Sequence, residues 1–446
     1  MSLDAWREVR LGDLVAIKHG WPFKSELFGA DLTGKPIVVS IGNFRYTGGF
    51  RFDSTQIKEY RGEYPAEFVL DPGDVLIVMT CQTPGGEILG IPARVPNDGR
   101  TYLHNQRMGK VVLKRPDLVD SDFLYWVFLG PEFNNELVAS ASGTKILHTA
   151  PGRIEAFKFR LPPVNEQRAV ARLLRALDDK IELNRNLNQT LEALGRAVFK
   201  SWFVDFDPTV ARTAGLTPYG MKAEIARRFP DRFVESELGP IPSGWRVSRI
   251  GRELTTKLGG TPARDQPQYW VDGTIPWVNS GEVNCFRITK PSQYITREGL
   301  ENSATKLIPA HTTVLAITGA TLGQVSILEI DSCVNQSVVG ILPSETLSTP
   351  FIYFWVRENI EQLLALQTGA AHQHINKNDA NELPLLVPEL EVTRTFSRFA
   401  GPLFDRIRAN CFEEDTLATL RDLLLPQLLS GEISLNQVEK LVEQAV

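Results

Sequence analysis

Two long stretches of this chain carry the residue spacing of helices that pack along a single stripe. In residues 163–203 the stripe positions alternate in steps of four and three, which is the period of a coiled coil. These positions are Leu177, Ile181, Asn184, Asn188, Leu191, Gly195, Val198 and Trp202. The stripe is widened by Leu173, Leu174, Leu187 and Leu194. A helix of about 38 residues is about 57 Å long at 1.5 Å per residue, so a stripe of this length needs a partner to cover it.

A second stretch, which begins at Pro388, supplies a partner of the same design. A shift of 226 positions superposes the two stretches. The predicted seam of the helix pair comprises Leu177, Ile181, Asn184, Leu191, Val198, Leu403, Ile407, Asn410, Leu417 and Leu424. Each stretch has an asparagine at the same place in its stripe, and a seam asparagine costs stability but fixes register and pairing. The alternative, two unrelated helices that each lie on their own domain, does not explain the shared residues.

Length and composition are those of a globular protein with more than one domain. The 446 residues suggest two to three domains, and the charged fraction of 23% is ordinary for a globular protein. The formal net charge is −5, so overall charge does not indicate nucleic-acid binding. Any surface that binds nucleic acid must therefore be a local patch.

The cysteines and the apolar runs bear on the compartment. The four cysteines are scattered, and no two form a C-x-x-C pair. This pattern favours reduced thiols in the cytoplasm and argues against a structural zinc site. No apolar run approaches the roughly 20 residues that a membrane span needs, and the charged N-terminal sequence MSLDAWREVRLGDL lacks the apolar core of a signal peptide. We therefore expect a cytoplasmic protein with no membrane partner.

The two helical stretches divide the chain into segments. These are a first domain at residues 1–161, a central long helix at 162–203, a connector at 204–243, a second domain at 244–387, and a distal long helix with the C-terminal tail at 388–446. In the first domain, turn-rich sequence separates predicted strands at residues 36–41, 75–80, 108–113 and 156–161, with a predicted helix at 121–137. The connector is predicted to hold one short helix near residues 221–228. It is too long for an ordinary loop, so it should pack against a neighbour or carry a function.

The second domain repeats the plan of the first in unbroken order. Ile275–Ser280 stands where residues 36–42 stood, Val314–Thr318 matches residues 75–80, Asn335-Gln336 matches Asn105-Gln106, and Phe354-Trp355 matches Tyr125-Trp126. The predicted fold class is α+β, with two similar mixed α/β domains joined by two long helices that form an antiparallel coiled coil, pseudo-twofold from internal duplication. Such a pair would hold the domains on the order of 50 Å apart, against about 34 Å for one turn of DNA. Two divergent domains on one chain would read an asymmetric, split DNA site.

Several motifs resemble the specificity subunit of type I restriction–modification systems, over essentially the whole chain. They are GGTPARDQPQYWVDGTIPWVNSGEV (residues 259–283), LPPVNEQRAVARLLRALDDKIELN (161–184), FVDFDPTVARTAG with RRFPDRFVESELGPIPSGW in the connector, and LLLPQLLSGEISL (423–435). The resemblance implies two target-recognition domains and two conserved helical regions. The first domain departs from the commoner pattern, with HGWPFKS (19–25) where the second has GGTPARD, so its loop is expected to take a different path.

The resemblance also implies partners and the cofactors that those partners carry. Double-stranded DNA and two modification subunits would bind one specificity subunit, and up to two restriction subunits can join the assembly. The modification subunit would bind S-adenosylmethionine and methylate adenine. ATP and Mg²⁺ would belong to the restriction subunit, and this chain would hold no cofactor of its own.

The sequence offers no convincing catalytic motif. An amino-methyltransferase needs an Asn/Asp-Pro-Pro-aromatic loop, and the only Pro-Pro here is Pro162-Pro163 at a helix entrance. No G-x-x-x-x-G-K-S/T phosphate loop is present. His372 and His374 lack a further ligand for zinc, and a DNA-facing loop is the better reading of them. The neighbouring Asp178 and Asp179 are read as a solvated helix face.

Polar loop residues with basic and aromatic neighbours are the candidates for DNA contact. Lys and Arg hold phosphates or read guanine, and Asn and Gln pair with adenine. In the first domain they are Lys18, His19, Trp21, Lys24, Ser25, Arg45, Tyr46, Gln82, Thr83, Asn105, Gln106, Arg107 and Lys145. In the second domain they are Lys257, Thr261, Arg264, Gln268, Tyr269, Asn279, Ser280, Thr318, Thr321, Gln324, Asn335, Gln336, His372, Gln373 and His374. A purely structural role stays open for several of them: Asn105 and Asn335 as turn caps, and Trp21 and Tyr269, together with Trp277, as core.

Three functional hypotheses follow from these patterns. The first is a non-catalytic DNA sequence-recognition subunit, in which each domain reads one half of a bipartite asymmetric site and the helix pair sets the spacing and docks methyltransferase subunits. The second is a two-domain protein-binding scaffold without sequence-specific DNA recognition. The third, a stand-alone enzyme, is disfavoured by the missing motifs.

Overall fold

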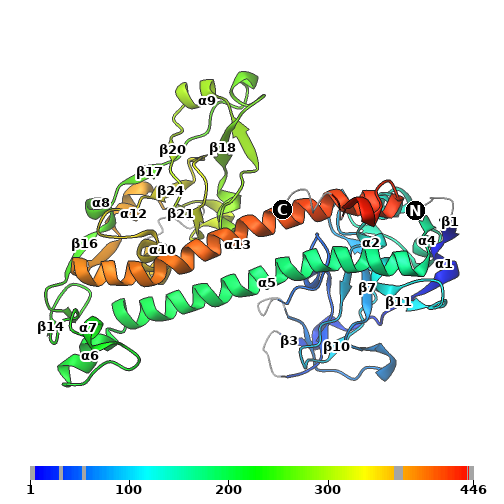
Figure 1. Ribbon diagram of the computed structural model, residues 1–446, viewed down its shortest axis with the longest axis horizontal. Coiled ribbons are helices and arrows are strands. Elements are labelled where there is room, and N and C mark those ends of the chain that lie inside the picture. Colours follow the sequence, from blue (N-terminus) through cyan, green and yellow to red (C-terminus); the bar gives the residue numbers. More distant parts are fainter. Residues whose placement is uncertain (1–5, 30–33, 53–56, 366–374, 439, 441–446) are drawn as a thin grey trace. The chain divides into compact units, whose positions relative to one another are not determined.

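The structure is a computed structural model that describes residues 6–29, 34–52, 57–365, 375–438 and 440. The chain forms two compact units: unit 1 comprises residues 1–180 and 417–446, and unit 2 comprises residues 181–416. Each unit contains one of the two duplicated domains and part of both long helices (Figure 1). Among the described residues, no helix has both the length and the apolar content of a membrane span.

Two small sheets build the domain of unit 1. The first is antiparallel, in the order β2 (Val15–His19), β11 (Met108–Leu113), β7 (Val75–Val78) and β9 (Pro92–Arg94). The second has the order β3 (Phe28–Gly29), β5 (Glu59–Tyr60), β4 (Ile37–Val38), β10 (Tyr102–Leu103) and β6 (Val69–Leu70), and its β4 and β10 run parallel. Two further pairs are β1 (Arg7–Arg10) with β13 (Lys158–Leu161), and β8 (Thr80–Cys81) with β12 (Leu147–His148). The short helices are α1 (Leu11–Leu14), η2 (Ser25–Leu27), η3 (Ile41–Asn43), η4 (Ala66–Phe68), α2 (Ser121–Leu129), α3 (Pro131–Ser140) and α4 (Pro151–Glu155).

The apolar sequence of β7 follows from burial on both of its faces. Val75 and Ile77 pack into a cluster with α2, whereas Leu76 and Val78 pack into the cluster that covers the second sheet. Successive side chains of a strand point to opposite faces. A strand with a core on each side is therefore apolar at every position, and this is the run that the sequence showed.

The predicted helix at residues 121–137 is in fact two helices, α2 and α3. Gly130 separates them with an extended backbone, φ −63° and ψ 138°, and its N–H caps the carbonyls of Trp126 and Val127. Pro131 excludes the helical conformation from the residue before it by steric contact. The prediction of one continuous helix is wrong at this point.

Unit 2 repeats the two-sheet plan. Its first sheet is antiparallel, in the order β17 (Thr256–Leu258), β24 (Val338–Ile341), β21 (Thr312–Ala316) and β22 (Val325–Leu328). Its second has the order β19 (Gln293–Ile295), β18 (Ile275–Val278), β23 (Ser332–Val334) and β20 (Leu307–Ile308), with β18 and β23 parallel. Two further pairs are β16 (Arg246–Arg249) with β25 (Pro384–Val387), and β14 (Phe233–Val234) with β15 (Ile241–Pro242). The short helices of the domain are α8 (Ile250–Glu253), η5 (Pro267–Tyr269), η6 (Ser280–Asn284), α9 (Arg297–Glu301), η7 (Gly319–Thr321), α10 (Thr349–Glu358), α11 (Ile360–Ala365) and α12 (Lys377–Glu382).

Within unit 2 the layers are stacked on the long helices. α10 lies next to the α13 segment, the first sheet follows, and the second sheet with α9 is farthest from the helix (Figure 1). In β21, Val314 and Ala316 pack between the two sheets, whereas Leu315 and Ile317 beyond the strand's end pack toward α10 and the long helices. The same alternation in β7 of unit 1 shows that the two domains share one design.

The duplication extends to individual backbone positions. A residue with positive φ precedes the central strand in each unit, Gly73 (φ 90°) before β7 and His311 (φ 61°) before β21. The N–H of Gly90 donates to Val78 O at 2.8 Å, and the N–H of Gly323 donates to Ala316 O at 2.9 Å, again both with positive φ. The sequence predicted that the two domains contain equivalent elements in the same order, and this prediction is confirmed.

The long helices are α5 (Val164–Phe203) and α13 (Leu390–Ser430), and they contact each other within each unit. In unit 1, Arg421 of α13 donates to Asp178 of α5 at 2.6 Å, and the Arg421 side chain is 9% exposed. In unit 2, Asn184 contacts Glu413 and Asn188 contacts Asn410, so rising numbers on α5 meet falling numbers on α13. The two helices are therefore antiparallel where they pair.

The predicted seam residues lie at the following places. Ile181, Asn184, Ile407, Asn410 and Leu424 are buried, and Leu177, Leu191, Val198, Leu403 and Leu417 are half-buried. Two expectations about the faces were wrong. Leu194 is 47% exposed and does not widen the stripe. Asp178 is not on a solvated face, because it is the counter-ion of a buried arginine, whereas its neighbour Asp179 is exposed.

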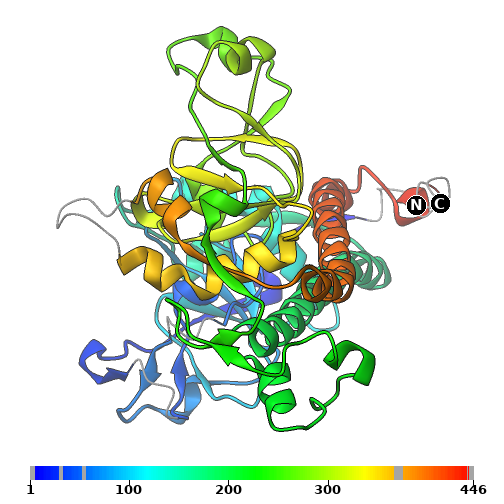
Figure 2. The ribbon, with the colours of Figure 1, turned by 90° about the vertical axis from the view of Figure 1, so that its left-hand side faces the viewer.

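The connector contains more structure than the sequence predicted. It holds two helices, α6 (Asp207–Thr213) and α7 (Ala223–Ala226), and the β14–β15 hairpin, where one helix at 221–228 was expected. Phe206 and Phe229 pack against Trp245 and Trp202, which anchors the segment to the core of unit 2. Figure 2 shows the connector beside the end of α5. The expectation that so long a segment packs against a neighbour is confirmed.

Candidate nucleic-acid interface

The parallel strand pair in each unit brings two candidate loops to one edge. In unit 1, Ser40 follows β4 and Asn105 follows β10; in unit 2, Asn279 follows β18 and Asn335 follows β23. The carboxyl ends of neighbouring parallel strands lie at the same edge, so residues far apart in sequence become neighbours there. We take these two edges as the candidate interface.

In unit 1 this edge is hollowed into a cleft of about 620 Å³. The cleft brings together five of the sequence-predicted residues, Ser25, Gln82, Asn105, Gln106 and Arg107. It is also lined by Ser40 and Lys58, which no sequence motif marks. Lys58 follows a segment with no recognisable motif, and only the pairing of β5 with β4 brings it to this edge.

The turn at the end of β10 is held from several sides. Asn105 Oδ1 accepts the N–H of Arg107 at 2.9 Å, and the N–H of Met108 donates to Asn105 O at 3.0 Å. Buried His104 bonds Met108 O through Nε2 at 2.9 Å. Burial lowers the pKa of His104 to about 4, so the ring is neutral at pH 7 and Nε2 carries the proton that it donates to the carbonyl.

The other candidates of unit 1 are spread around this cleft or lie outside it. Lys18 and His19 are exposed at the end of β2, and Trp21 bridges Asn105 and packs on Phe23. Lys24 precedes η2, and Arg45 and Tyr46 occupy the turn after η3. Thr83 donates to Glu87, and Lys145 is exposed in the loop before β12.

The same edge in unit 2 is organised by a second copy of the turn. Asn335 Oδ1 accepts the N–H of Ser337 at 3.1 Å, and the hydroxyl of Thr261 donates to the side chain of Gln336. A side chain at Gly259 would meet Asn335 O at 2.2 Å, as one at Gly20 would meet Asn105 O at 2.2 Å. The two loops therefore start along one path. Beyond that start the loops differ, as expected, because the loop of unit 1 leads into η2 and β3 whereas the loop of unit 2 leads into η5.

Arg264 and Asn279 are fixed by neighbouring side chains. The Arg264 guanidinium lies 3.7 Å from the ring centroid of Trp270 and donates to Gln293 Oε1 at 2.7 Å. Asn279 caps η6 by accepting the N–H of Gly281 at 2.7 Å. Gln293 is a polar partner that sequence reasoning missed, because it comes from a strand edge with no motif.

The remaining described candidates of unit 2 lie on or beside four elements. Lys257 on β17 donates to Leu307 O at 3.1 Å, and Gln268 and Tyr269 are on η5. Ser280 begins η6, while Thr318, Thr321 and Gln324 lie in or beside η7, which contacts η6. His372, Gln373 and His374 lie outside the described residues.

The structural alternatives account for part of the candidate set. Asn105 and Asn335 do cap turns, through the same Oδ1 to N–H bond in both units. Trp277 is 2% exposed and belongs to the core, whereas Trp21 and Tyr269 are half-buried. In the part of the chain that the structure describes, no group of three or more His, Cys, Asp or Glu could hold a metal ion.

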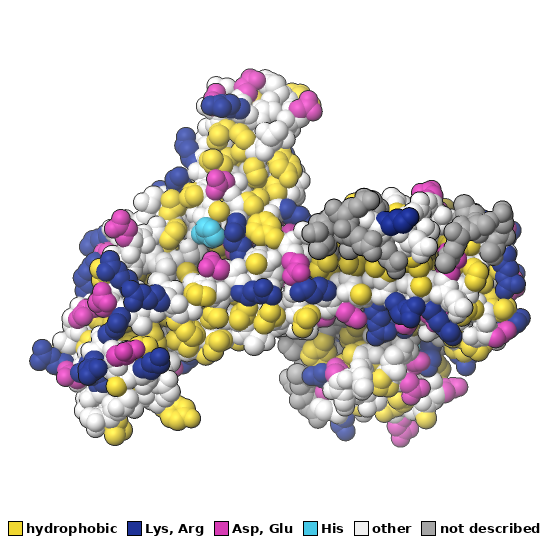
Figure 3. All heavy atoms as spheres, viewed as in Figure 1, with side chains coloured by type: hydrophobic (Ala, Val, Ile, Leu, Met, Phe, Trp, Pro, Cys, Tyr) yellow, Lys and Arg dark blue, Asp and Glu magenta, His cyan; other side chains and the backbone are white. Residues whose placement is uncertain are grey.

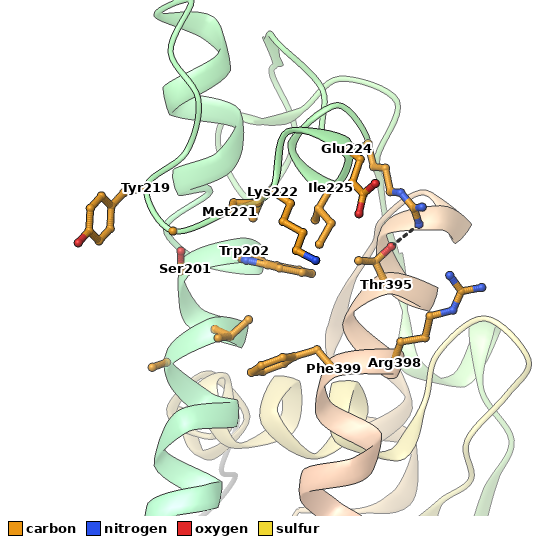
Figure 4. A pocket seen from close by; sticks show the side chains of 14 residues that line it. Ser201, Trp202, Tyr219, Met221, Lys222, Glu224, Ile225, Thr395, Arg398 and Phe399 are labelled. Atoms are coloured by element: carbon orange, nitrogen blue, oxygen red, sulfur yellow. Dashed lines mark hydrogen bonds between the residues drawn. The ribbon is translucent and has the colours of Figure 1, made fainter.

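A separate groove of about 710 Å³ lies in unit 2 between the end of α5, the connector and the start of α13 (Figure 4). Its apolar lining includes Trp202, Met221, Ile225 and Phe399, and its polar lining includes Lys222, Arg228, Arg398 and Glu224. Arg228 Nη1 donates a hydrogen bond to Thr395 Oγ1 at 2.7 Å. On the face drawn in Figure 3, apolar side chains lie at the surface of unit 2 beside Lys and Arg side chains.

A protein-family model described as the type I restriction modification DNA specificity domain matches residues 4–193 and 242–403. The chain belongs to this family. Each matched segment contains one domain and the beginning of one long helix, as the duplication requires. The resemblance of the sequence motifs to type I specificity subunits is thereby confirmed, and the chain is a DNA target-recognition subunit of this family.

Two relatives in the family match most of this chain. The specificity subunit of the type I restriction enzyme HindI from Haemophilus influenzae is 26% identical, over 96% of this chain and 99% of the relative. The MjaIX specificity subunit from Methanocaldococcus jannaschii is 25% identical, over 75% of this chain and 73% of its own. The crystal structure of the type I S subunit from M. genitalium matches with a TM-score of 0.57 at 15% identity, over 95% of this chain and 96% of that one. The structural match confirms the α+β fold with two similar domains and long helices.

Proposed function

We propose that each of the two domains recognises one half of a bipartite, asymmetric DNA site. The observation that carries this proposal is the pair of matched edges, each with the same capped Asn-Gln turn and with different side chains around it. An identical framework with divergent polar residues suits two readers of different base sequences. Two identical edges would suit a palindrome instead.

A domain exchange tests this proposal. Replacing residues 1–161 by the first domain of another family member should change the bases of one half-site and leave the other half-site and the spacer as they were. Replacing residues 244–387 should do the same for the other half. A change in both half-sites after either exchange would refute the assignment of one half-site to each domain.

We propose further that the paired helices set the spacing between the half-sites. The antiparallel contacts support this, because α5 and α13 each contribute to both units and pair with each other in each unit. Inserting seven residues into each helix at the level of the Asn184–Glu413 hydrogen bond would lengthen the pair by about 10 Å, or about three base pairs. The spacer should lengthen while both half-sites keep their bases; altered half-site bases would refute this role.

The groove beside the connector is proposed as a docking surface for a methyltransferase subunit. Among the described residues, Lys222 and Arg398 form no ion pair, so the rim offers positive charge around an apolar floor. The complementary occupant is an acidic segment with apolar side chains from the methyltransferase. The double variant K222E/R398E should lose the co-purifying methyltransferase, whereas the exposed-site control Arg232→Glu should retain it. Retention by both variants would refute the docking site.

The chemistry is assigned to partners and not to this chain. In this proposal two modification subunits bind S-adenosylmethionine and methylate adenine, restriction subunits with ATP and Mg²⁺ can join, and the complex works in the cytoplasm. The purified chain, incubated with S-adenosylmethionine and duplex DNA, should transfer no methyl group until the methyltransferase is added. Transfer by the chain alone would refute the non-catalytic assignment.

The rival reading is a protein-binding scaffold, and family membership does not favour it. It predicts that removal of the basic loop at residues 18–24 leaves DNA affinity unchanged. Our proposal predicts weaker binding, with no change in the amount of methyltransferase that co-purifies.

A further inference from the structure

The two copies of the Asn-Gln turn have the same backbone bonds, position by position. In unit 1, the N–H of Arg107 donates to Asn105 Oδ1 at 2.9 Å, and Arg107 O accepts the N–H of Met79 at 2.9 Å. In unit 2, the N–H of Ser337 donates to Asn335 Oδ1 at 3.1 Å, and Ser337 O accepts the N–H of Ile317 at 2.9 Å. Arg107 and Ser337 are therefore equivalent positions.

This position is where the two turns diverge in chemistry. The residues before it are the same in both units, Asn105-Gln106 and Asn335-Gln336. The third residue is a long cation in unit 1 and a short hydroxyl in unit 2. Because the backbone of the turn makes the same hydrogen bonds in both units, the side chain at this position determines which chemical group the turn offers to a ligand.

The surroundings of Arg107 suit recognition and not a structural role. Its side chain is exposed and lines the cleft with Gln82 and Lys58. Within the described part of the chain, its guanidinium makes no hydrogen bond and no ion pair. Its backbone N–H and C=O both form hydrogen bonds, so the Cα of Arg107 is held in place while the five N–H donors of its guanidinium stay available.

We propose that Arg107 is a specificity-determining residue of the first domain and that it selects guanine. This inference rests on the proposed function of the two domains. The planar guanidinium matches the O6 and N7 acceptors of guanine bidentately, and it is the commonest side chain in that role. Lys58 in the same cleft has a single charged group and suits a phosphate, which leaves the forked donor for the base. Ser337 gives the second domain a different preference from the same turn.

The test uses the full chain, purified from its own host with the subunits that accompany it, and a randomised 30-base-pair duplex library. The wild-type complex should select guanine at one position of one half-site. R107S, which copies the residue of the second domain, should lose that preference, bind the selected duplex about ten-fold more weakly or worse, and keep the other half-site unchanged. R107K keeps the charge but loses the planar fork, so it should weaken the guanine preference while it keeps the salt dependence of binding. K58S should weaken all sequences alike and lower the salt slope by about one.

Two other outcomes have distinct meanings. Retained guanine preference in R107S, or an equal loss for every sequence, would overturn the assignment of Arg107 and leave the two-domain proposal standing. Selection of no bipartite motif by the wild-type complex would overturn both. Because Arg107 is exposed and serine occupies the matching turn, R107S should unfold at the wild-type temperature, which circular dichroism checks.

Discussion

The buried asparagines of the helix pair allow a quantitative test of how α5 and α13 are matched in unit 2. Asn410 Nδ2 donates to Asn188 Oδ1 at 2.8 Å, and Asn188 Nδ2 donates to Glu414 Oε1 at 3.0 Å. Both asparagines are almost fully buried. The perturbation is a double-mutant cycle of Asn188→Ala and Asn410→Ala, with the exposed Asn186→Ala on the same helix as the matched control.

The magnitudes follow from which groups lose a partner. Asn410→Ala leaves Asn188 Oδ1 buried without its donor, which costs about 1–3 kcal/mol. Asn188→Ala orphans Asn410 Nδ2 and also removes a donor from the half-buried Glu414 carboxylate, so it should cost about 1 kcal/mol more. The double variant removes donor and acceptor together, so its cost should fall short of the sum by about 1–2 kcal/mol.

Hydrogen–deuterium exchange of the peptide at residues 184–192 measures the local opening free energy directly. Each Asn→Ala change also gains helix propensity, so each single variant is read against Asn186→Ala and the double variant against twice its effect. Asn186→Ala by itself should stay within about 0.5 kcal/mol of the wild type. Additive costs for Asn188→Ala and Asn410→Ala would refute the reasoning, because they would mean that the two side chains do not act as a bonded pair.

Three further predictions concern unit 1. Burial lowers the pKa of His104 from 6.5 to about 4, so the unfolded state takes up its proton at higher pH than the folded state does. The free energy of unfolding should therefore fall by up to about 3 kcal/mol as the pH drops from about 6.5 to 4. His104→Gln should abolish this dependence, as measured by thermal unfolding at a series of pH values. Arg421→Met leaves the Asp178 carboxylate without its counter-ion, and urea unfolding should show a loss of about 1–2 kcal/mol, with no loss contradicting the ion pair's role. Gly20→Ala would place a Cβ 2.2 Å from a backbone carbonyl oxygen and should destabilise the domain by more than about 2 kcal/mol, whereas Gly152→Ala in α4 meets nothing within 4 Å and should stabilise it by about 0.5 kcal/mol or more in thermal unfolding.

The architecture was predictable because its strongest signals are periodic or repeated. The apolar spacing in steps of four and three predicted the two long helices, and the repeated Asn-Gln pair showed which residues of the two domains are equivalent. What failed depended on local backbone or on a partner distant in sequence. Gly130-Pro131 interrupts the predicted helix through a local backbone effect, because Pro131 excludes the helical conformation from Gly130. Asp178 looked solvated because Arg421, its counter-ion, lies on the other helix.

The candidate site was predictable as a set of loops but not as a surface. Gln82, Gln106 and Arg107 carry polar groups next to predicted strands, and these were found from sequence. Lys58 was missed because only the pairing of β5 with β4 carries it to the cleft. The hydrogen bonds show that Asn105 and Asn335 cap the turns, which is a structural role. The sequence alone does not distinguish such capping residues from residues whose side chains are available to DNA. Which bases the described loops contact stays a prediction.

The sequence motif in which adenine is methylated in the source genome tests the central claim most directly. Sequencing that detects modified adenine should reveal one motif made of two different half-sites separated by a fixed spacer. After residues 1–161 are exchanged for those of another family member, one half-site should change and the other should persist. A continuous motif, a palindrome, or a change in both half-sites after that exchange would contradict the account.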